Sequence, residues 1–166
     1  MRIGTRWLPA ALVVLAALAP AGCGKKKEAE VPIMVYQTSD MLATPAERLA
    51  RVMPLLDPAA GVKPSDADFI FLEQSRKEGL SQVRERRLFA ALYLDRAALA
   101  AVRSRLKPMG RPAYQPALGP APWWPGPDQF DGLQFYSTEG VLRRPGGFAA
   151  CYPDGESLFL YGDQTR

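Results

Sequence analysis

The sequence predicts an α+β fold, in which an antiparallel sheet that ends in a C-terminal β-hairpin carries about two helices on one face. Three observations lead to this class. Two segments begin with helix-capping residues, at Thr44 and at Asp95. Residues 108–132 are too rich in Pro and Gly for regular helix or central strand. The C-terminal part has a Pro-Asp-Gly-Glu turn at 153–156 between two predicted strands, as a β-hairpin does.

The first predicted helix begins at a capping box. Thr44 and Glu47 stand three residues apart, and Pro45 occupies the first helical position. The apolar stripe of this helix is formed by Leu49, Val52 and Leu56. Because proline lacks an N–H and clashes with the preceding turn, Pro54 ends or kinks the helix after about two turns.

The second predicted helix spans residues 96–107 and has Asp95 as its N-cap. Its apolar side is formed by Leu99, Val102 and Leu106. Basic residues in the last turn suit the helix dipole, and Pro108 and Gly110 stop the helix.

Six short segments are predicted to be strands, namely residues 33–36, 69–72, 88–94, 133–137, 147–152 and 157–161. The charged segment 76–87 fits either a long hairpin connection or a short exposed helix. Its run Arg84-Glu85-Arg86-Arg87 is expected to be a solvated edge, where charge discourages aggregation. Residues 108–132 are expected to be a loop packed on the domain, because they contain Trp123 and Trp124.

The composition excludes several classes of function. With 166 residues, 48% of them apolar and none of them His, the chain fits one globular domain over residues 33–166 and excludes histidine-based triads and metal sites. The net charge is +4, but five basic residues lie within the first 27. The remaining 16 basic residues are balanced by 17 acidic ones, so the net charge without the first five basic residues is about −1. This charge excludes a nucleic-acid binder.

The first 22 residues have the order of a secretory signal peptide. Arg2 and Arg6 are followed by an apolar run from Trp7 to Pro20 and by small residues. That run of 14 residues reaches about 21 Å as a helix, against about 30 Å of hydrocarbon. Export is therefore favoured over a membrane-spanning anchor.

Ala21-Gly22-Cys23, placed behind this run and before a polar stretch, resembles the cleavage site of a bacterial lipoprotein precursor. The family pattern prefers Leu three residues before the cysteine, where this chain has Pro20. The resemblance implies cleavage before Cys23, a diacylglycerol on its thiol and an acyl chain on its new amino group. These covalent lipids are the only cofactors expected.

Residues 23–32 then form a polar, flexible tether to the membrane. Gly24 after the cysteine implies passage to the outer membrane, facing the periplasm. The alternative is an ordinary signal-peptidase cut after Ala21, which gives a soluble secreted protein with a Cys23–Cys151 disulfide. If Cys23 is acylated, Cys151 is an unpaired thiol and is expected to be buried and inert.

Trp123 and Trp124, with Asp128 and Asp131, are the most distinctive cluster of the body. Aromatic rings stack on sugars and two acids are the minimum for glycoside hydrolysis, so a carboxylate-dependent hydrolase or binder of envelope glycans is one interpretation. The other is that the tryptophans pin the loop to the sheet and the aspartates cap turns. Tyr136 is a further candidate ligand-binding residue.

The other groups of candidate residues give weaker indications of function. Tyr136, Tyr152 and Tyr161 fit either a tyrosine platform on the sheet or half-buried core. Asp66 and Asp68 with Glu73 do not match a calcium loop, so no metal is expected. The sequence therefore predicts a non-catalytic envelope lipoprotein, a binding or scaffolding module with the membrane and a possible envelope protein or glycan as partners.

Overall fold

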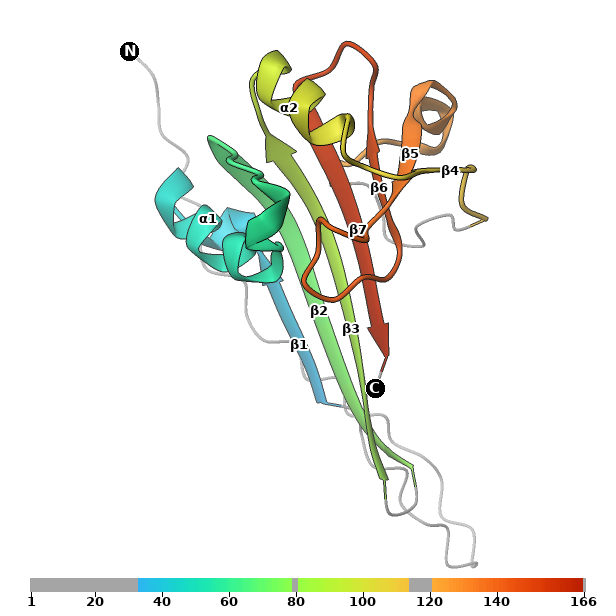
Figure 1. Ribbon diagram of the computed structural model, residues 1–166. Helices are drawn as coiled ribbons and strands as arrows, with labels where there is room; N and C mark the ends of the chain where they lie inside the picture. Colours follow the sequence, from blue (N-terminus) through green and yellow to red (C-terminus); the bar gives the residue numbers. More distant parts are fainter. Residues whose placement is uncertain (1–32, 79–80, 114–120, 166) are drawn as a thin grey trace, which may run out of the picture.

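The computed structural model describes residues 33–78, 81–113 and 121–165, and within them seven strands form one antiparallel sheet in the order β1-β2-β3-β7-β6-β5-β4 (Figure 1). The strands are β1 (Ile33–Thr38), β2 (Asp66–Glu78), β3 (Ser81–Tyr93), β4 (Pro108–Met109), β5 (Gln134–Ser137), β6 (Phe148–Cys151) and β7 (Ser157–Thr165). The predicted C-terminal hairpin is confirmed, since β6 pairs with β7. The α+β class is confirmed with it.

The helical segments of the described chain are two α-helices and four 3-10 turns. They are η1 (Ser39–Met41), α1 (Pro45–Val52), η2 (Met53–Leu55), η3 (Pro58–Ala60), α2 (Arg96–Arg103) and η4 (Pro127–Gly132). The predicted capping box is present: Glu47 N–H donates to the Thr44 hydroxyl, and Thr44 N–H donates to Glu47. Asp95 caps α2 as expected, because its carboxylate accepts from Ala98 N–H at 2.7 Å.

The prediction that the second helix runs to Lys107 is wrong, because α2 ends at Arg103. Tighter turns follow, in which Arg105 N–H donates to Val102 and Leu106 N–H to Arg103. A proline disfavours helical backbone angles in the residue before it, so Pro108 disfavours a helical conformation at Lys107. The Lys107 carbonyl instead accepts from Ser137 N–H at 2.9 Å, which leads the chain into β4.

The segment that the sequence left open, residues 76–87, belongs to a long hairpin. β2 and β3 pair in register from Asp66 opposite Tyr93 to Glu78 opposite Ser81. The expectation of a solvated edge at residues 84–87 is wrong, since β3 is a central strand between β2 and β7. The register of β2 and β3 places Arg86 directly opposite Glu73. Arg86 donates a hydrogen bond to Glu73 at 3.1 Å, and the two opposite charges compensate each other.

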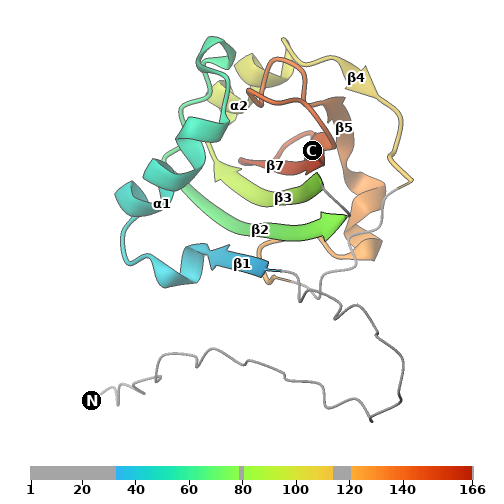
Figure 2. The same ribbon diagram turned by 90° about the horizontal axis from the view of Figure 1, so that it is seen from below.

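The sheet is packed on both faces. On one face α1, α2 and the segments beside them cover a first core that includes Val52, Leu92, Leu99, Val102 and Leu160. On the other face residues 121–132 help to cover a second core, which is mostly aromatic and includes Phe89, Trp124, Phe130, Phe148 and Phe159. Figure 2 shows β2 and β3 curving between these layers. Both α-helices therefore lie on one face, as predicted.

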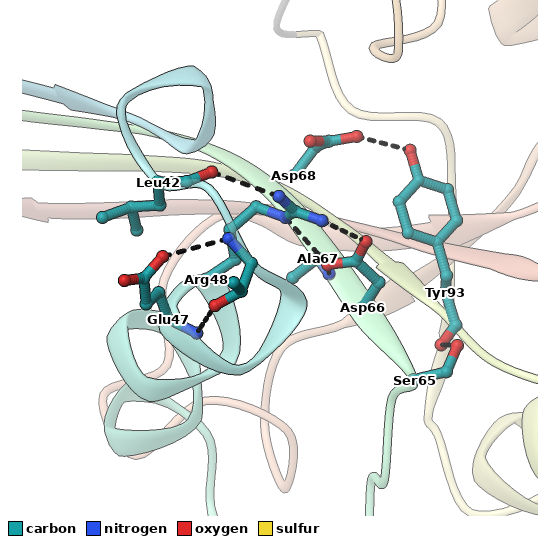
Figure 3. Close-up of polar contacts among 9 residues, drawn as sticks. Leu42, Glu47, Arg48, Ser65, Asp66, Ala67, Asp68 and Tyr93 are labelled. Atoms are coloured by element: carbon teal, nitrogen blue, oxygen red, sulfur yellow. Dashed lines mark hydrogen bonds and ion pairs between the residues drawn. The ribbon is translucent and has the colours of Figure 1, made fainter.

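Arg48 fastens α1 to the start of β2 (Figure 3). Its guanidinium donates to both carboxylate oxygens of Asp66, at 2.9 and 2.5 Å, and also to the Leu42 carbonyl at 3.2 Å. Two parallel N–H···O bonds fix the angle between helix and strand as well as their distance. The hydrogen bonds from Arg48 lower the pKa of Asp66 below its ordinary value.

Asp66→Asn should lower the free energy of unfolding by about 1 kcal/mol near pH 7, since the pair is bidentate but partly exposed. Because the folded-state pKa of Asp66 is lowered, its contribution is present above the unfolded pKa, near 3.8, and is lost as pH falls further. Denaturant unfolding between pH 2.5 and 7 measures this. Asp154→Asn, in an exposed turn, is the control. An unchanged wild-type–variant difference across that range would contradict the expectation.

Candidate functional site

The tryptophan loop faces the sheet. Trp124 is only 8% exposed, and its ring meets Phe89 and Phe159 edge-on at centroid distances of 5.3 and 5.9 Å. Trp123 is half-buried and packs edge-on against Trp124 at 6.1 Å. These contacts assign both side chains to the second core, where they hold the proline-rich segment in place.

The two aspartates of the predicted cluster point elsewhere. Asp128 and Asp131 lie exposed on η4, and Asp131 pairs with Arg111. Tyr136 lies on the opposite face of the sheet, in the first core, where its hydroxyl donates to Gln134 at 2.9 Å. The structure therefore does not bring Tyr136 together with the tryptophans. The tyrosine platform fails for the same reason, since Tyr152 and Tyr161 pack in the second core.

Cys151 is buried as expected, with 0% of its surface exposed, and it is free. Burial raises the pKa of its thiol, and this effect exceeds the opposing influence of Arg103 and Tyr136. A thiol with a raised pKa inside a core is a poor nucleophile. A disulfide to Cys151 would require the first core to open. Cys23 itself lies outside the described residues.

Three acidic residues of β2, namely Asp66, Asp68 and Glu73, have separate partners. Asp66 pairs with Arg48, Asp68 accepts a 2.7 Å hydrogen bond from the Tyr93 hydroxyl, and Glu73 pairs with Arg86. Burial, and then the hydrogen bond to Asp68, raise the pKa of Tyr93. In the part of the chain that the structure describes, no group of three His, Cys, Asp or Glu residues is placed to hold a metal ion.

A cavity of about 320 Å³ lies on the helix face of the sheet, and the sequence interpretation missed it. We call it the arginine cavity. Its floor is formed by three adjacent strands, through Phe71 of β2, Leu88 of β3 and Gly162 of β7. Its walls are η2, through Pro54 and Leu55, and the β5–β6 loop, through Leu142, Arg143 and Arg144; Arg86 also lines it. Figure 1 shows this loop lying over the sheet beside the segment that follows α1.

Backbone hydrogen bonds join the two walls. Arg143 N–H donates to the Leu55 carbonyl at 3.0 Å, and Asp57 N–H donates to the Val141 carbonyl at 2.7 Å. The Arg143 side chain adds a bond from Nε to the Leu56 carbonyl at 3.1 Å. Leu56 and Leu142 form an isolated β-bridge between these bonds. The backbone of the cavity walls is therefore fixed before any ligand binds. Binding then does not require the free energy of ordering these walls.

Glycines let the β5–β6 loop lie close to β7. A Cβ on Gly147 would stand 2.2 Å from the Tyr161 carbonyl oxygen, and one on Gly146 would stand 2.3 Å from that of Asp163. Gly147 also has φ +86°, in the left-handed region. In the floor, a Cβ on Gly162 would stand 3.2 Å from Leu142. The sequence signal for this site was Arg143-Arg144-Pro145-Gly146-Gly147, a cationic pair beside a close backbone approach.

A second cavity of about 510 Å³ lies at the β4–β5 edge and is lined in part by Met109, Phe135 and Tyr136. Its two charged lining residues, Arg111 and Asp131, pair with each other. The arginine cavity differs, because its nine described lining residues include three arginines and no acid. Arg86 of this lining pairs with Glu73, so the arginine cavity also contains a paired charge.

Comparisons with protein-family models, with curated proteins and with solved structures found no match to this chain. Among the residues that the structure describes, no helix is long and apolar enough to cross a membrane.

Gly147→Ala tests how firmly the cavity wall depends on this close approach. We expect a loss of about 3 kcal/mol or more in the free energy of unfolding, because the new methyl group would overlap the Tyr161 carbonyl. Gly140→Ala is the matched control: its φ is +76°, but nothing lies within 4 Å of the added Cβ. It should cost only about 1 kcal/mol, for the left-handed backbone alone. Equal losses in thermal or denaturant unfolding would contradict the packing argument.

Proposed function

We propose that this protein is a non-catalytic envelope lipoprotein, a binding module held at a membrane surface by lipid on Cys23. The observation that carries the proposal is Ala21-Gly22-Cys23 behind the apolar run. Two or three acyl chains give stable attachment, at about 0.8 kcal/mol per buried CH₂, whereas one chain gives only reversible binding. The outer membrane, facing the periplasm, is the proposed location.

The chain length limits where the body would sit. Ten residue steps separate Cys23 from Ile33, the first residue of β1. A fully extended chain covers at most about 3.6 Å per residue, so the body would start no more than about 36 Å from the lipid. An anchored domain would thus meet ligands and partners at, or close to, that membrane surface.

The geometry supports binding over catalysis. Asp66, Asp68 and Glu73 of β2 have partners, and the Cys151 thiol is buried with a raised pKa. The arginine cavity offers guanidinium groups, which stay protonated and so are suited to hold an anion rather than to exchange protons. Of the two tryptophans that could have stacked on a glycan, Trp124 is buried and Trp123 is half-buried.

The anchor is tested by feeding growing cells an acyl-chain precursor that carries a label. The wild-type protein should take up the label and fractionate with membranes, and Cys23→Ser should do neither. Cys151→Ser is the matched control, because it changes the other cysteine and should leave labelling unchanged. Wild-type protein without label, found in the soluble fraction, would overturn the proposal and favour the secreted alternative.

Thiol titration of the mature protein gives an independent measure. If Cys23 is acylated, no thiol should react in the folded protein, because Cys151 is fully buried, and one thiol should react after denaturation. A thiol that reacts at once in the native state would indicate a bare Cys23. If no thiol reacts after denaturation without reductant, a Cys23–Cys151 disulfide is indicated instead.

A further inference from the structure

We propose that two copies of this protein pair edge to edge through their β1 strands, antiparallel, and so join their two sheets into one. The two-fold axis of the pair passes beside Val35, which stands opposite Val35 of the second copy. The inference rests on the proposed function in one respect, namely that lipid on Cys23 gathers copies on one membrane.

The outer edge of β1 has none of the features that usually keep a sheet edge single. In the described part of the chain β1 lies at the end of the sheet and pairs with β2 alone (Figure 1). Its six residues include no charged residue and no proline, which are common means of preventing edge-to-edge pairing. Val35 and Tyr36 are respectively 40% and 49% exposed there. A strand of this composition is a template for another strand.

The opposite end of the same sheet is protected. It is formed by β4, which has only two residues, Pro108 and Met109. Proline has no N–H to donate to a neighbouring strand, and a short edge strand offers little to pair with. A pair that forms through both β1 edges therefore leaves only the two protected β4 edges outside, so it closes as a dimer and does not grow into a filament.

The chemistry of the edge and the length of the tether identify the occupant. An edge strand turns the N–H and C=O groups of alternate residues outward, and another strand satisfies such a row of groups. The tether ends at β1 itself, since Ile33 lies ten residue steps from Cys23. Every anchored copy therefore carries this edge within the same distance of the bilayer, at most about 36 Å. The strand that is always present at that height is β1 of a second copy.

The geometry of antiparallel pairing limits the register. Residues directly opposite each other either both turn their backbone groups toward the other strand or both turn them away. Two identical strands must therefore pair odd with odd and even with even residues, and the axis passes beside one residue. An axis at Val35 places Tyr36 opposite Met34, apolar opposite apolar, whereas an axis at Tyr36 places Val35 opposite Gln37. Cross-strand apolar pairs stabilise a sheet, so the axis at Val35 is favoured.

This arrangement is compatible with anchoring of both copies in one bilayer. With about 3.3 Å per residue and strands about 4.8 Å apart, the two Ile33 residues lie about 14 Å apart in the pair. Each tether can extend to about 36 Å, so both reach the same membrane. The antiparallel direction of the two strands therefore does not separate the two anchors.

The size of the contact makes the pair dependent on the membrane. A strand of six residues is about 20 Å long, and such an edge contact buries less than the roughly 1,200 Å² of stable complexes. A pair of free copies is therefore weak. Anchoring confines the copies to one surface and raises their effective concentration without any new contact. We expect dimers on membranes, and in solution only at high protein concentration.

The test uses the natural mature protein in phosphatidylcholine vesicles, with one cysteine introduced on β1 and oxidised by copper phenanthroline. Val35→Cys should give mostly disulfide-linked dimer, because opposite residues of antiparallel strands lie within disulfide reach. Tyr36→Cys is the matched control: Tyr36 is at least as exposed as Val35, but its two copies would lie about 8 Å apart, beyond the limit of about 7 Å. It should give about tenfold less dimer.

A mixture of Met34→Cys and Tyr36→Cys copies gives a second measure. This register places these two residues opposite each other, so the mixture should form a mixed dimer although neither variant does so alone. The proposal is overturned if Val35→Cys gives no more dimer than Tyr36→Cys, or if the mixture gives no more dimer than its components. Wild-type protein should give no disulfide-linked dimer, because Cys151 is buried. Thermal unfolding of each variant verifies that the fold is kept.

Cys23→Ser separates this proposal from the anchor. In solution, Cys23→Ser combined with Val35→Cys should cross-link at about 1 mM protein, where the concentration replaces the tether, and much less at micromolar concentration. The same preference for Val35→Cys over Tyr36→Cys should hold at the high concentration. If acyl labelling fails and this preference remains, only the anchor is overturned. If labelling succeeds and the preference is absent, only the pairing is overturned.

Discussion

Burial of β3 on both faces is the constraint on which the rest of the structure depends. Leu88, Ala90 and Leu92 enter the first core, while Phe89 and Ala91 enter the second. A strand that is apolar on both sides needs a cover on each face. The helices provide one cover. The proline-rich segment helps to provide the other, and for that reason Trp124 and Phe130 turn inward rather than toward a ligand.

Local signals in the sequence predicted most elements, because they act over a few residues. The Thr44–Glu47 capping box, the Asp95 N-cap and the turn of the C-terminal hairpin each satisfy backbone groups within their own segment. The wrong predictions fell where a segment distant in the sequence determines the local structure. The charged run 84–87 reads as an edge until Glu73 is placed opposite Arg86, and that register is set by the whole β2–β3 pairing.

The candidate site could not be predicted for the same reason. The arginine cavity combines five segments, from Pro54 to Gly162, which become neighbours only when the β5–β6 loop folds over β7. The tryptophan cluster, by contrast, was visible because its members are adjacent in sequence. Trp123 and Trp124 do pack together, whereas Asp128 and Asp131 lie exposed on η4. The choice between solvent and core depended on the uncovered face of the sheet.

A body with a charge of about −1 and a cavity with three arginines are compatible, because the two statements concern different distances. Charges separated by more than a Debye length, about 8 Å at physiological salt, are largely screened. The value of about −1 is a sum over the whole body. The lining of the arginine cavity brings Arg86, Arg143 and Arg144 close together, and Arg86 pairs there with Glu73. The net charge of the body therefore does not describe the charge at one small site.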